Sequence, residues 1–206
     1  MYNFKLTEEI ARWAFEIICH ENPNWYISFT NPTAGPWKTI KGLDKSGTEG
    51  EVYRFELEET RPDIVLVNDQ LQLIIIIEAK DSLKKLTHAN QSYKSVEVVN
   101  TLNSLLKSSE VKSNPFWGKR ADYTILTGLL WGAETPTSII ERSTTFDEYH
   151  KNMKNFPQLT NNIIIGIETR RKGDGLQCYF CGKIYPSPSS FSDLNIIASS
   201  FNLPII

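Results

Sequence analysis

The sequence predicts an α/β domain, an α/β/α sandwich built on a mixed central β-sheet. Two stretches carry apolar residues at helical spacing, and several short apolar runs are typical of buried strands. Along the chain these segments alternate as helix, three strands, helix, strand, helix and strand, an αβββαβ core with one more helix and strand. An antiparallel hairpin followed by strands that are reached through helical crossovers gives a mixed sheet between helical layers.

The first half of the chain begins with a helix. Thr7 is a suitable N-cap, Glu8 and Glu9 favour the first turn, and apolar residues recur at helical spacing as far as His20. Residues 22–48 are rich in Asn, Pro, Gly, Thr and Lys, which predicts a long insertion loop with room for one short strand at 25–29. Polar and apolar residues then alternate over 52–58. That period predicts the first strand of a three-stranded meander.

The second half continues the alternation of helices and strands. After the hairpin, the expected elements are a helix, a buried strand, a short helix and a second buried strand, at 88–107, 123–130, 145–155 and 162–167. Residues 173–206 are predicted to form a C-terminal extension that ends in a short helix at 194–201.

Length and composition are those of one domain over residues 1–206. The net charge of −2 argues mildly against a nucleic-acid partner, but only the local field of a cleft decides such binding. No run reaches the about 18 apolar residues of a membrane span. An odd count of three cysteines disfavours a disulfide framework, so a reducing cytoplasm is the expected location.

The hairpin is the most informative segment. Its first apolar run follows Asp63, and its second ends in Glu78-Ala79-Lys80. A two-residue turn would place Asp63 opposite Ile76, whereas a four-residue turn would place it opposite Glu78. In both registers the two carboxylates lie within reach of one cation.

Charged groups at the ends of such apolar strands suit metal-dependent hydrolysis of phosphodiesters. Glu78 and Lys80 project to the same side because strand side chains alternate. Mg²⁺ prefers oxygen ligands and retains waters, which leaves room for a phosphate. A water bound to Mg²⁺ has a lowered pKa, and the ammonium of Lys80 can orient that water or stabilise the developing charge.

Pro62-Asp63 together with Glu78-Ala79-Lys80 resembles the motif of the PD-(D/E)xK nuclease superfamily. The resemblance implies a restriction-endonuclease-like fold: a helix, a three-stranded meander, a helix and a further strand. It also implies that Asp63, Glu78 and the carbonyl of Ala79 bind Mg²⁺, and that Asp63, Glu78 and Lys80 are catalytic.

The small single domain without ATPase motifs favours a type II restriction endonuclease that cuts double-stranded DNA as a homodimer. A structure-selective nuclease, such as a junction resolvase or repair enzyme, is the alternative within the class. A non-catalytic DNA-binding subunit of the same fold and an unrelated soluble α/β protein remain open.

A further acid is often supplied by the first helix in this superfamily. Glu16 is the first candidate and Glu9 the second, with Glu49 and Glu51 as rivals ahead of the predicted first strand. Each of these carboxylates has a plainer interpretation as a solvated surface charge.

Basic side chains near the motif and in a Gly-containing hairpin are candidate DNA contacts. A solvated loop is the alternative for each set. The candidates are Lys84, Lys85 and Lys94 after the motif, and Arg170, Arg171 and Lys172 in the hairpin.

Cys178 and Cys181 have the spacing of half a zinc site. Four ligands are needed for structural zinc, and no second pair at that spacing exists. Two strand residues that happen to be cysteine are therefore the favoured interpretation.

Overall fold

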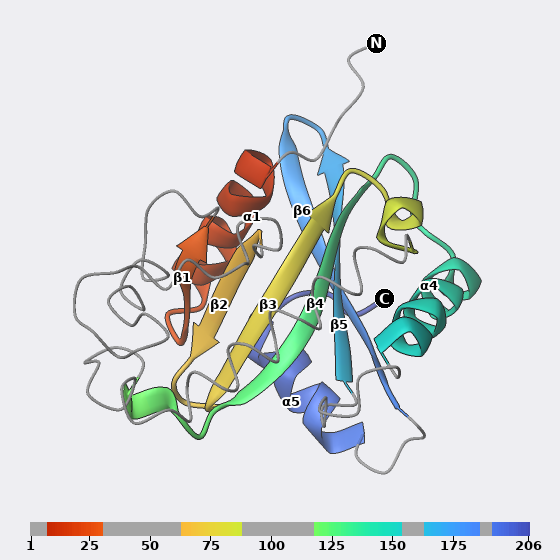
Figure 1. Ribbon diagram of the computed structural model, residues 1–206. Coiled ribbons are helices and arrows are strands. Elements are labelled where there is room, and N and C mark those ends of the chain that lie inside the picture. The colour runs from red at the N-terminus through yellow and green to blue at the C-terminus, as the bar shows by residue number, and fades with distance from the viewer. Residues whose placement is uncertain (1–7, 31–62, 88–117, 154–162, 186–190) are drawn as a thin grey trace, which may run out of the picture.

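The computed structural model describes residues 8–30, 63–87, 118–153, 163–185 and 191–206. These residues form a six-stranded sheet in the order β1-β2-β3-β4-β5-β6, with three α-helices (Figure 1). The elements are α1 (Glu8–Glu21), β1 (Trp25–Thr30), β2 (Ile64–Asn68), β3 (Leu73–Lys80), the 3₁₀ helices η3 (Leu83–Thr87) and η4 (Gly118–Arg120), β4 (Thr124–Ala133), α4 (Ile139–Met153), β5 (Ile163–Lys172), β6 (Gly175–Ile184) and α5 (Phe191–Phe201).

The sheet is mixed in direction. Strands β1, β2 and β3 form an antiparallel meander, β3, β4 and β5 run parallel, and β6 returns antiparallel beside β5. The carboxyl ends of β3, β4 and β5 therefore lie at one edge of the sheet. In open α/β sheets, that edge is where ligands commonly bind.

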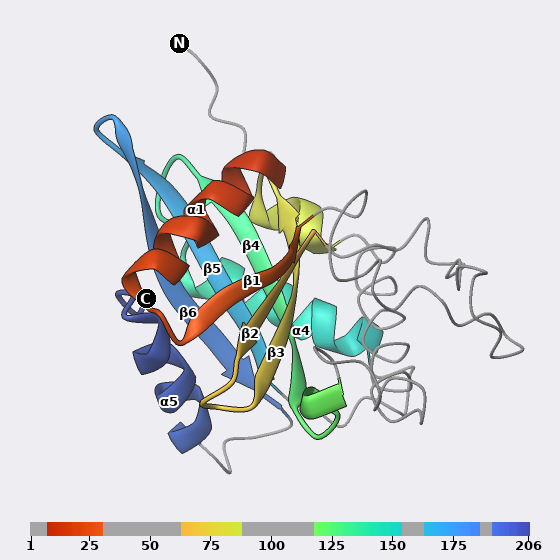
Figure 2. The same cartoon turned by 90° about the vertical axis from the view of Figure 1, so that its left-hand side faces the viewer.

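Helices cover both faces of the sheet (Figure 2). On β3, Ile75 and Ile77 belong to the apolar cluster that includes Phe15 of α1 and Phe201 of α5. On β4, Leu130 belongs to the same cluster, whereas the following residue, Trp131, points to the opposite face. Trp131 belongs to a second apolar cluster, together with residues of η3 and α4. The faces are referred to below as the α1/α5 face and the α4 face.

The predicted α/β class and mixed sheet are confirmed. The short strand expected at 25–29 is present as β1, and it occupies the place beside β2 that the sequence assigned to residues 52–58. Residues 52–58, the helix expected at 88–107 and the part of the insertion loop beyond Thr30 lie outside the described residues.

Helix α4 begins earlier than the predicted helix at 145–155 because a capping box starts it. The Ser138 hydroxyl accepts a hydrogen bond from Glu141 N at 3.1 Å, and the Glu141 carboxylate accepts one from Ser138 N at 3.0 Å. The spacing of apolar residues does not indicate this start, because Ile139 and Ile140 are exposed and do not belong to the buried side of the helix.

Residues 173–206, predicted as an extension, contribute a full strand and a core helix. Strand β6 pairs with β5 from Gly175 to Ile184. On α5, Phe201 is fully buried and stacks on Trp25 with ring centroids 4.4 Å apart. The C-terminal part of the chain is therefore integral to the core.

Candidate functional site

The β2–β3 hairpin has the longer of the two predicted turns. Asn68 pairs with Leu73 and Ile64 with Ile77, so residues 69–72 form the turn. The Asn68 side chain stabilises this turn by accepting a hydrogen bond from Leu71 N at 2.9 Å. Continued by one residue, the register places Asp63 opposite Glu78.

Three polar side chains meet where β2 begins and β3 ends. Asp63 Oδ2 accepts a 2.7 Å hydrogen bond from the backbone N–H of Ala79. The Lys80 ammonium donates to Glu78 Oε1 and, at 3.0 Å, to the Ala79 carbonyl, and it lies 3.8 Å from Asp63 Oδ2. These side chains keep partial contact with solvent: 24% of Lys80 and 11% of each acid are exposed. We call these four residues the Asp63–Glu78 cluster.

The oxygen atoms of this cluster suit a hard cation. The Lys80 ammonium is already held by the three oxygens, from Asp63, Glu78 and Ala79, that the resemblance assigns to Mg²⁺. Among the described residues, no group of three or more His, Cys, Asp or Glu side chains is placed to hold a metal. Two carboxylates and a carbonyl leave the other positions of an octahedral ion to water and phosphate.

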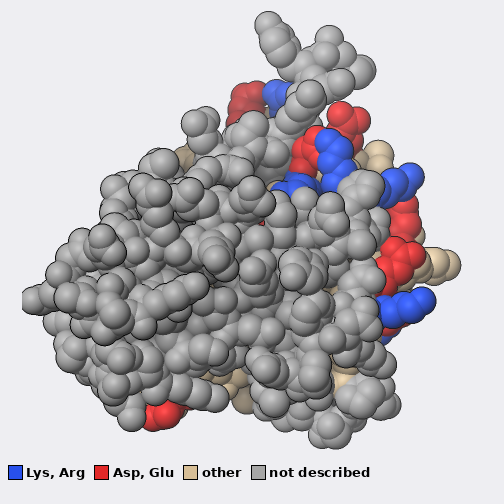
Figure 3. All heavy atoms as spheres, in the orientation of Figure 1, with Lys and Arg blue, Asp and Glu red and all other residues tan. Residues whose placement is uncertain are grey.

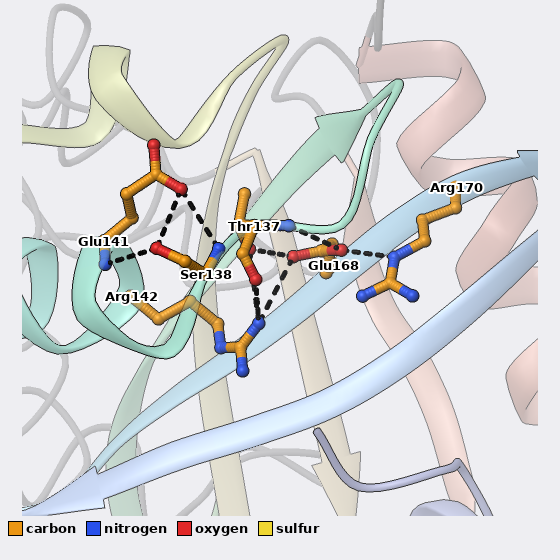
Figure 4. A network of polar contacts seen from close by, with 6 residues as sticks. All are labelled: Thr137, Ser138, Glu141, Arg142, Glu168 and Arg170. Atoms are coloured by element: carbon orange, nitrogen blue, oxygen red, sulfur yellow. Dashed lines mark hydrogen bonds and ion pairs between the residues drawn. The ribbon is translucent and has the colours of Figure 1, made fainter.

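A buried carboxylate lies in the same row of the sheet, two strands away from Lys80. Lys80 is in register with Trp131 of β4, and Trp131 with Glu168 of β5. Glu168 is fully buried and accepts hydrogen bonds from Arg170 Nε and Thr137 Oγ1, with Arg142 Nη1 at 3.9 Å (Figure 4). Two guanidinium groups therefore neutralise this carboxylate, which ties the start of α4 to β5.

Sequence reasoning missed the Glu168 network. Besides Arg170, which follows Glu168 by two residues on β5, its partners come from the loop before α4 and from α4 itself, and no short motif signals such a pairing. The Ser138-x-x-Glu141 capping box is the one local signal that could have located the helix start beside it.

Two of the three basic candidates after the motif lie on η3. Lys84 and Lys85 are both exposed, and Lys85 pairs with Asp81 at 2.5 Å. Lys94 lies outside the described residues. In the view of Figure 3, the Lys and Arg side chains of the described residues are interspersed with Asp and Glu rather than gathered in a patch of one sign.

The basic residues at the end of β5 differ from one another. Arg170 pairs with Glu168, and its guanidinium carbon lies 4.0 Å from the centroid of the Tyr179 ring. Arg171 and Lys172 are exposed beside the hairpin turn, where Arg171 Nε donates to Gly173 O at 3.2 Å. Arg170 thus makes internal contacts, whereas Arg171 and Lys172 face solvent.

The candidates for an additional acid lie on an element that packs on the other face of the sheet, or outside the described residues. Glu16 is exposed on α1, and its neighbours Phe15 and Ile18 pack on the α1/α5 face. Glu78 and Lys80 alternate with Ile77 and Ala79 of that face, so they project to the α4 face. Glu49, Glu51 and the side chain of Glu9 lie outside the described part.

Cys178 and Cys181 are strand residues on β6 and project to opposite faces. Cys178 packs against the α1/α5 cluster, whereas Cys181 belongs to the α4 cluster, so the two thiols do not share a zinc ion. Burial raises the pKa of Cys178 to about 11 and that of Cys181 to about 12. The interpretation as two ordinary strand cysteines is in agreement with this placement.

Comparisons with known proteins give no relative: no family model, no curated protein and no solved structure matches the chain significantly. No helix in the described residues is both long and apolar enough to span a membrane.

Proposed function

We propose that this protein is a Mg²⁺-dependent endodeoxyribonuclease with a restriction-endonuclease-like fold. The observation that carries the proposal is the convergence of Asp63, Glu78, Ala79 and Lys80 at the carboxyl end of β3. Two acids and a lysine, directed to one point with a carbonyl between them, can bind a metal ion and stabilise the charge that develops when a phosphodiester is hydrolysed.

The order of the described elements supports the proposal. A helix, α1, precedes the antiparallel meander β1 to β3, and β4 is added parallel to β3. This is the order that the resemblance implies, with the intervening helix expected in 88–107, outside the described residues. The cluster also lies at the edge of the sheet where parallel strands end, a common place for ligands.

In the proposed mechanism, Asp63, Glu78 and the Ala79 carbonyl hold the ion. Bound Mg²⁺ supplies a water of lowered pKa and offsets charge on the phosphate. The N–H of Ala79 fixes one oxygen of Asp63, so that this carboxylate is oriented before the ion arrives. Lys80 then orients the attacking water and stabilises the developing negative charge.

Within this class, a homodimeric type II restriction endonuclease acting on double-stranded DNA is the first candidate. A structure-selective nuclease is the second, and one observation favours it. Arg170, a candidate DNA contact in the hairpin, is engaged with Glu168 and Tyr179. The hairpin then offers Arg171 and Lys172 to DNA, and phosphate contacts from these two residues would position a nuclease without reading the sequence.

The test is cleavage of plasmid, phage and branched DNA by the purified protein with Mg²⁺ or with EDTA. Glu78→Gln should abolish cleavage, whereas Glu21→Gln, a matched change of an exposed glutamate on α1, should not. Discrete bands identify a sequence-specific enzyme, and selective cutting of branched DNA identifies the second candidate. Full activity of Glu78→Gln, or no cleavage of any DNA in Mg²⁺, contradicts the proposal.

A further inference from the structure

A cavity of about 440 Å³ opens on the α4 face of the sheet. It is lined by residues that follow β3, by the end of β4 and by the first turns of α4. Its volume is within the range of about 300–1,000 Å³ that is typical of small-ligand sites. Ser82 of its lining follows Lys80 by two residues, and Gly132 directly follows Trp131, the register partner of Lys80. The cavity thus lies near the carboxyl end of β3, where the Asp63–Glu78 cluster is found, although none of the four cluster residues lines it.

The walls of the cavity carry more negative than positive charge. Glu134, Glu141 and Glu148 line it together with one cation, Lys84. Apolar side chains such as Ile140 and several threonines complete the lining. Such a surface disfavours a phosphate group, but it suits a flat, partly apolar ring that carries hydrogen-bond donors.

Three of the amides at the start of α4 already have acceptors. Ser138 N and Glu141 N are both used in the capping box, at 3.0 and 3.1 Å. Thr137 N lies 3.5 Å from the Glu168 carboxylate. These occupied amides and the acidic lining disfavour a phosphate here, although a helix N-terminus otherwise attracts one. The phosphodiester belongs at the Asp63–Glu78 cluster, outside this cavity.

We propose that the cavity binds one nucleobase with an exocyclic amino group, from the nucleotide next to the cleaved phosphodiester. The inference rests on the proposed nuclease function and adds the part of the substrate that enters the protein. Carboxylates accept hydrogen bonds from the amino groups of adenine, cytosine and guanine, whereas thymine has no such group. Extruding a base from a duplex costs a few kcal/mol, and contacts of this kind offset that cost.

Two neighbouring residues of α4 provide a matched pair of variants. Ile139 and Ile140 are exposed to 75% and 77%, but only Ile140 lines the cavity. Ile140→Trp should fill the cavity mouth, whereas Ile139→Trp adds the same side chain outside it. Because both positions are exposed, neither variant is expected to lose the fold, which circular dichroism and urea unfolding will verify.

The experiment is saturation-transfer NMR with the four 2′-deoxynucleosides, without phosphate and without Mg²⁺. Deoxyadenosine, deoxycytidine and deoxyguanosine should bind the wild type and Ile139→Trp, and at least about tenfold more weakly Ile140→Trp. Thymidine should bind the weakest. Absence of binding, equal binding of thymidine, or undiminished binding by Ile140→Trp overturns the proposal.

This readout is separate from that of the nuclease proposal. Nucleoside binding requires no cleavage. Binding of nucleosides without hydrolysis of any DNA would therefore support the cavity proposal and contradict the nuclease proposal. Hydrolysis without nucleoside binding would remove the cavity assignment alone.

Discussion

The backbone N–H of Ala79 donates a 2.7 Å hydrogen bond to Oδ2 of Asp63. This contact joins the end of β3 to Asp63, the residue just before β2. Because Asp63 lies outside the strand, the hydrogen bond is what orients its carboxylate. A side chain fixed in this way loses little further freedom when it binds a ligand. The metal site that we propose is therefore partly organised by the hairpin itself.

Asp63→Asn should separate the structural role of this residue from its chemical role. The amide oxygen of asparagine can still accept the N–H of Ala79, so we expect a loss of only about 1 kcal/mol in the free energy of unfolding. Mg²⁺ binding, measured by calorimetry, should fall to baseline because one of two anionic ligands is gone. Wild-type Mg²⁺ affinity in this variant would show that Asp63 is not a ligand.

Lys80→Ala should change activity and metal affinity in opposite directions. Loss of one preorganised electrostatic contact lowers the rate by about 10²–10³-fold. The ammonium now occupies the oxygens of Glu78 and Ala79, so its removal should tighten Mg²⁺ binding. Lys151→Ala, an exposed lysine of α4, is the control for both measurements. Weaker Mg²⁺ binding by Lys80→Ala would exclude competition between the two cations.

Local patterns in the sequence predicted the hairpin and the cluster. The spacing of Asp63 and Glu78 allowed two registers, and the four-residue turn brings the acids opposite each other. The strand that pairs with β2 is harder to predict from the sequence, because residues 25–30 and 52–58 both have strand character. Which of them joins β2 depends on packing against distant residues, and strand propensity is weak beside that effect. The ion pair of Glu168 with Arg142 could not be predicted for the same reason, because the two residues are 26 positions apart (168 − 142) and meet only in the folded chain.

Glu168→Ala should be strongly destabilising. Glu168 is fully buried and Arg142 is 8% exposed, so the variant leaves a buried guanidinium without its carboxylate. Breaking a buried pair on one side costs about 3–5 kcal/mol. Urea unfolding measures this change, and Glu148→Ala, an exposed glutamate of α4, should stay within about 0.5 kcal/mol of the wild type. Equal stability of the two variants would contradict the role of the network.

The three thiols should react slowly in the folded protein. Burial raises the pKa of Cys19 and Cys181 to about 12 and that of Cys178 to about 11, so little thiolate exists at pH 8. Iodoacetamide labelling followed by mass spectrometry should give little modification in buffer and three modified cysteines in urea.

Addition of a zinc chelator should leave the unfolding midpoint unchanged, because Cys178 and Cys181 project to opposite faces. Rapid native labelling or a chelator-dependent midpoint would be inconsistent with this arrangement.

The far end of the hairpin is held by Asp69. Its carboxylate accepts hydrogen bonds of 2.9 Å from Nε and Nη2 of Arg120, and one of 2.8 Å from the Tyr123 hydroxyl. Burial opposes ionisation of Asp69, but the hydrogen bonds from Arg120 and Tyr123 outweigh it and lower its pKa below the ordinary value. The charged form is thus favoured by the folded state.

Stability should consequently depend on Asp69 in acid. An aspartate whose pKa is lowered by folding contributes its full stabilisation above the unfolded-state value of about 3.9, and loses it as the pH falls through the folded-state pKa. Asp69→Asn cannot titrate, so the difference in unfolding free energy between wild type and variant should be constant above about pH 5 and shrink below about pH 4. Urea unfolding from pH 7 to pH 2 measures this difference. A constant difference across the whole range would mean that Arg120, which is only 2% exposed, does not depend on the charge of Asp69.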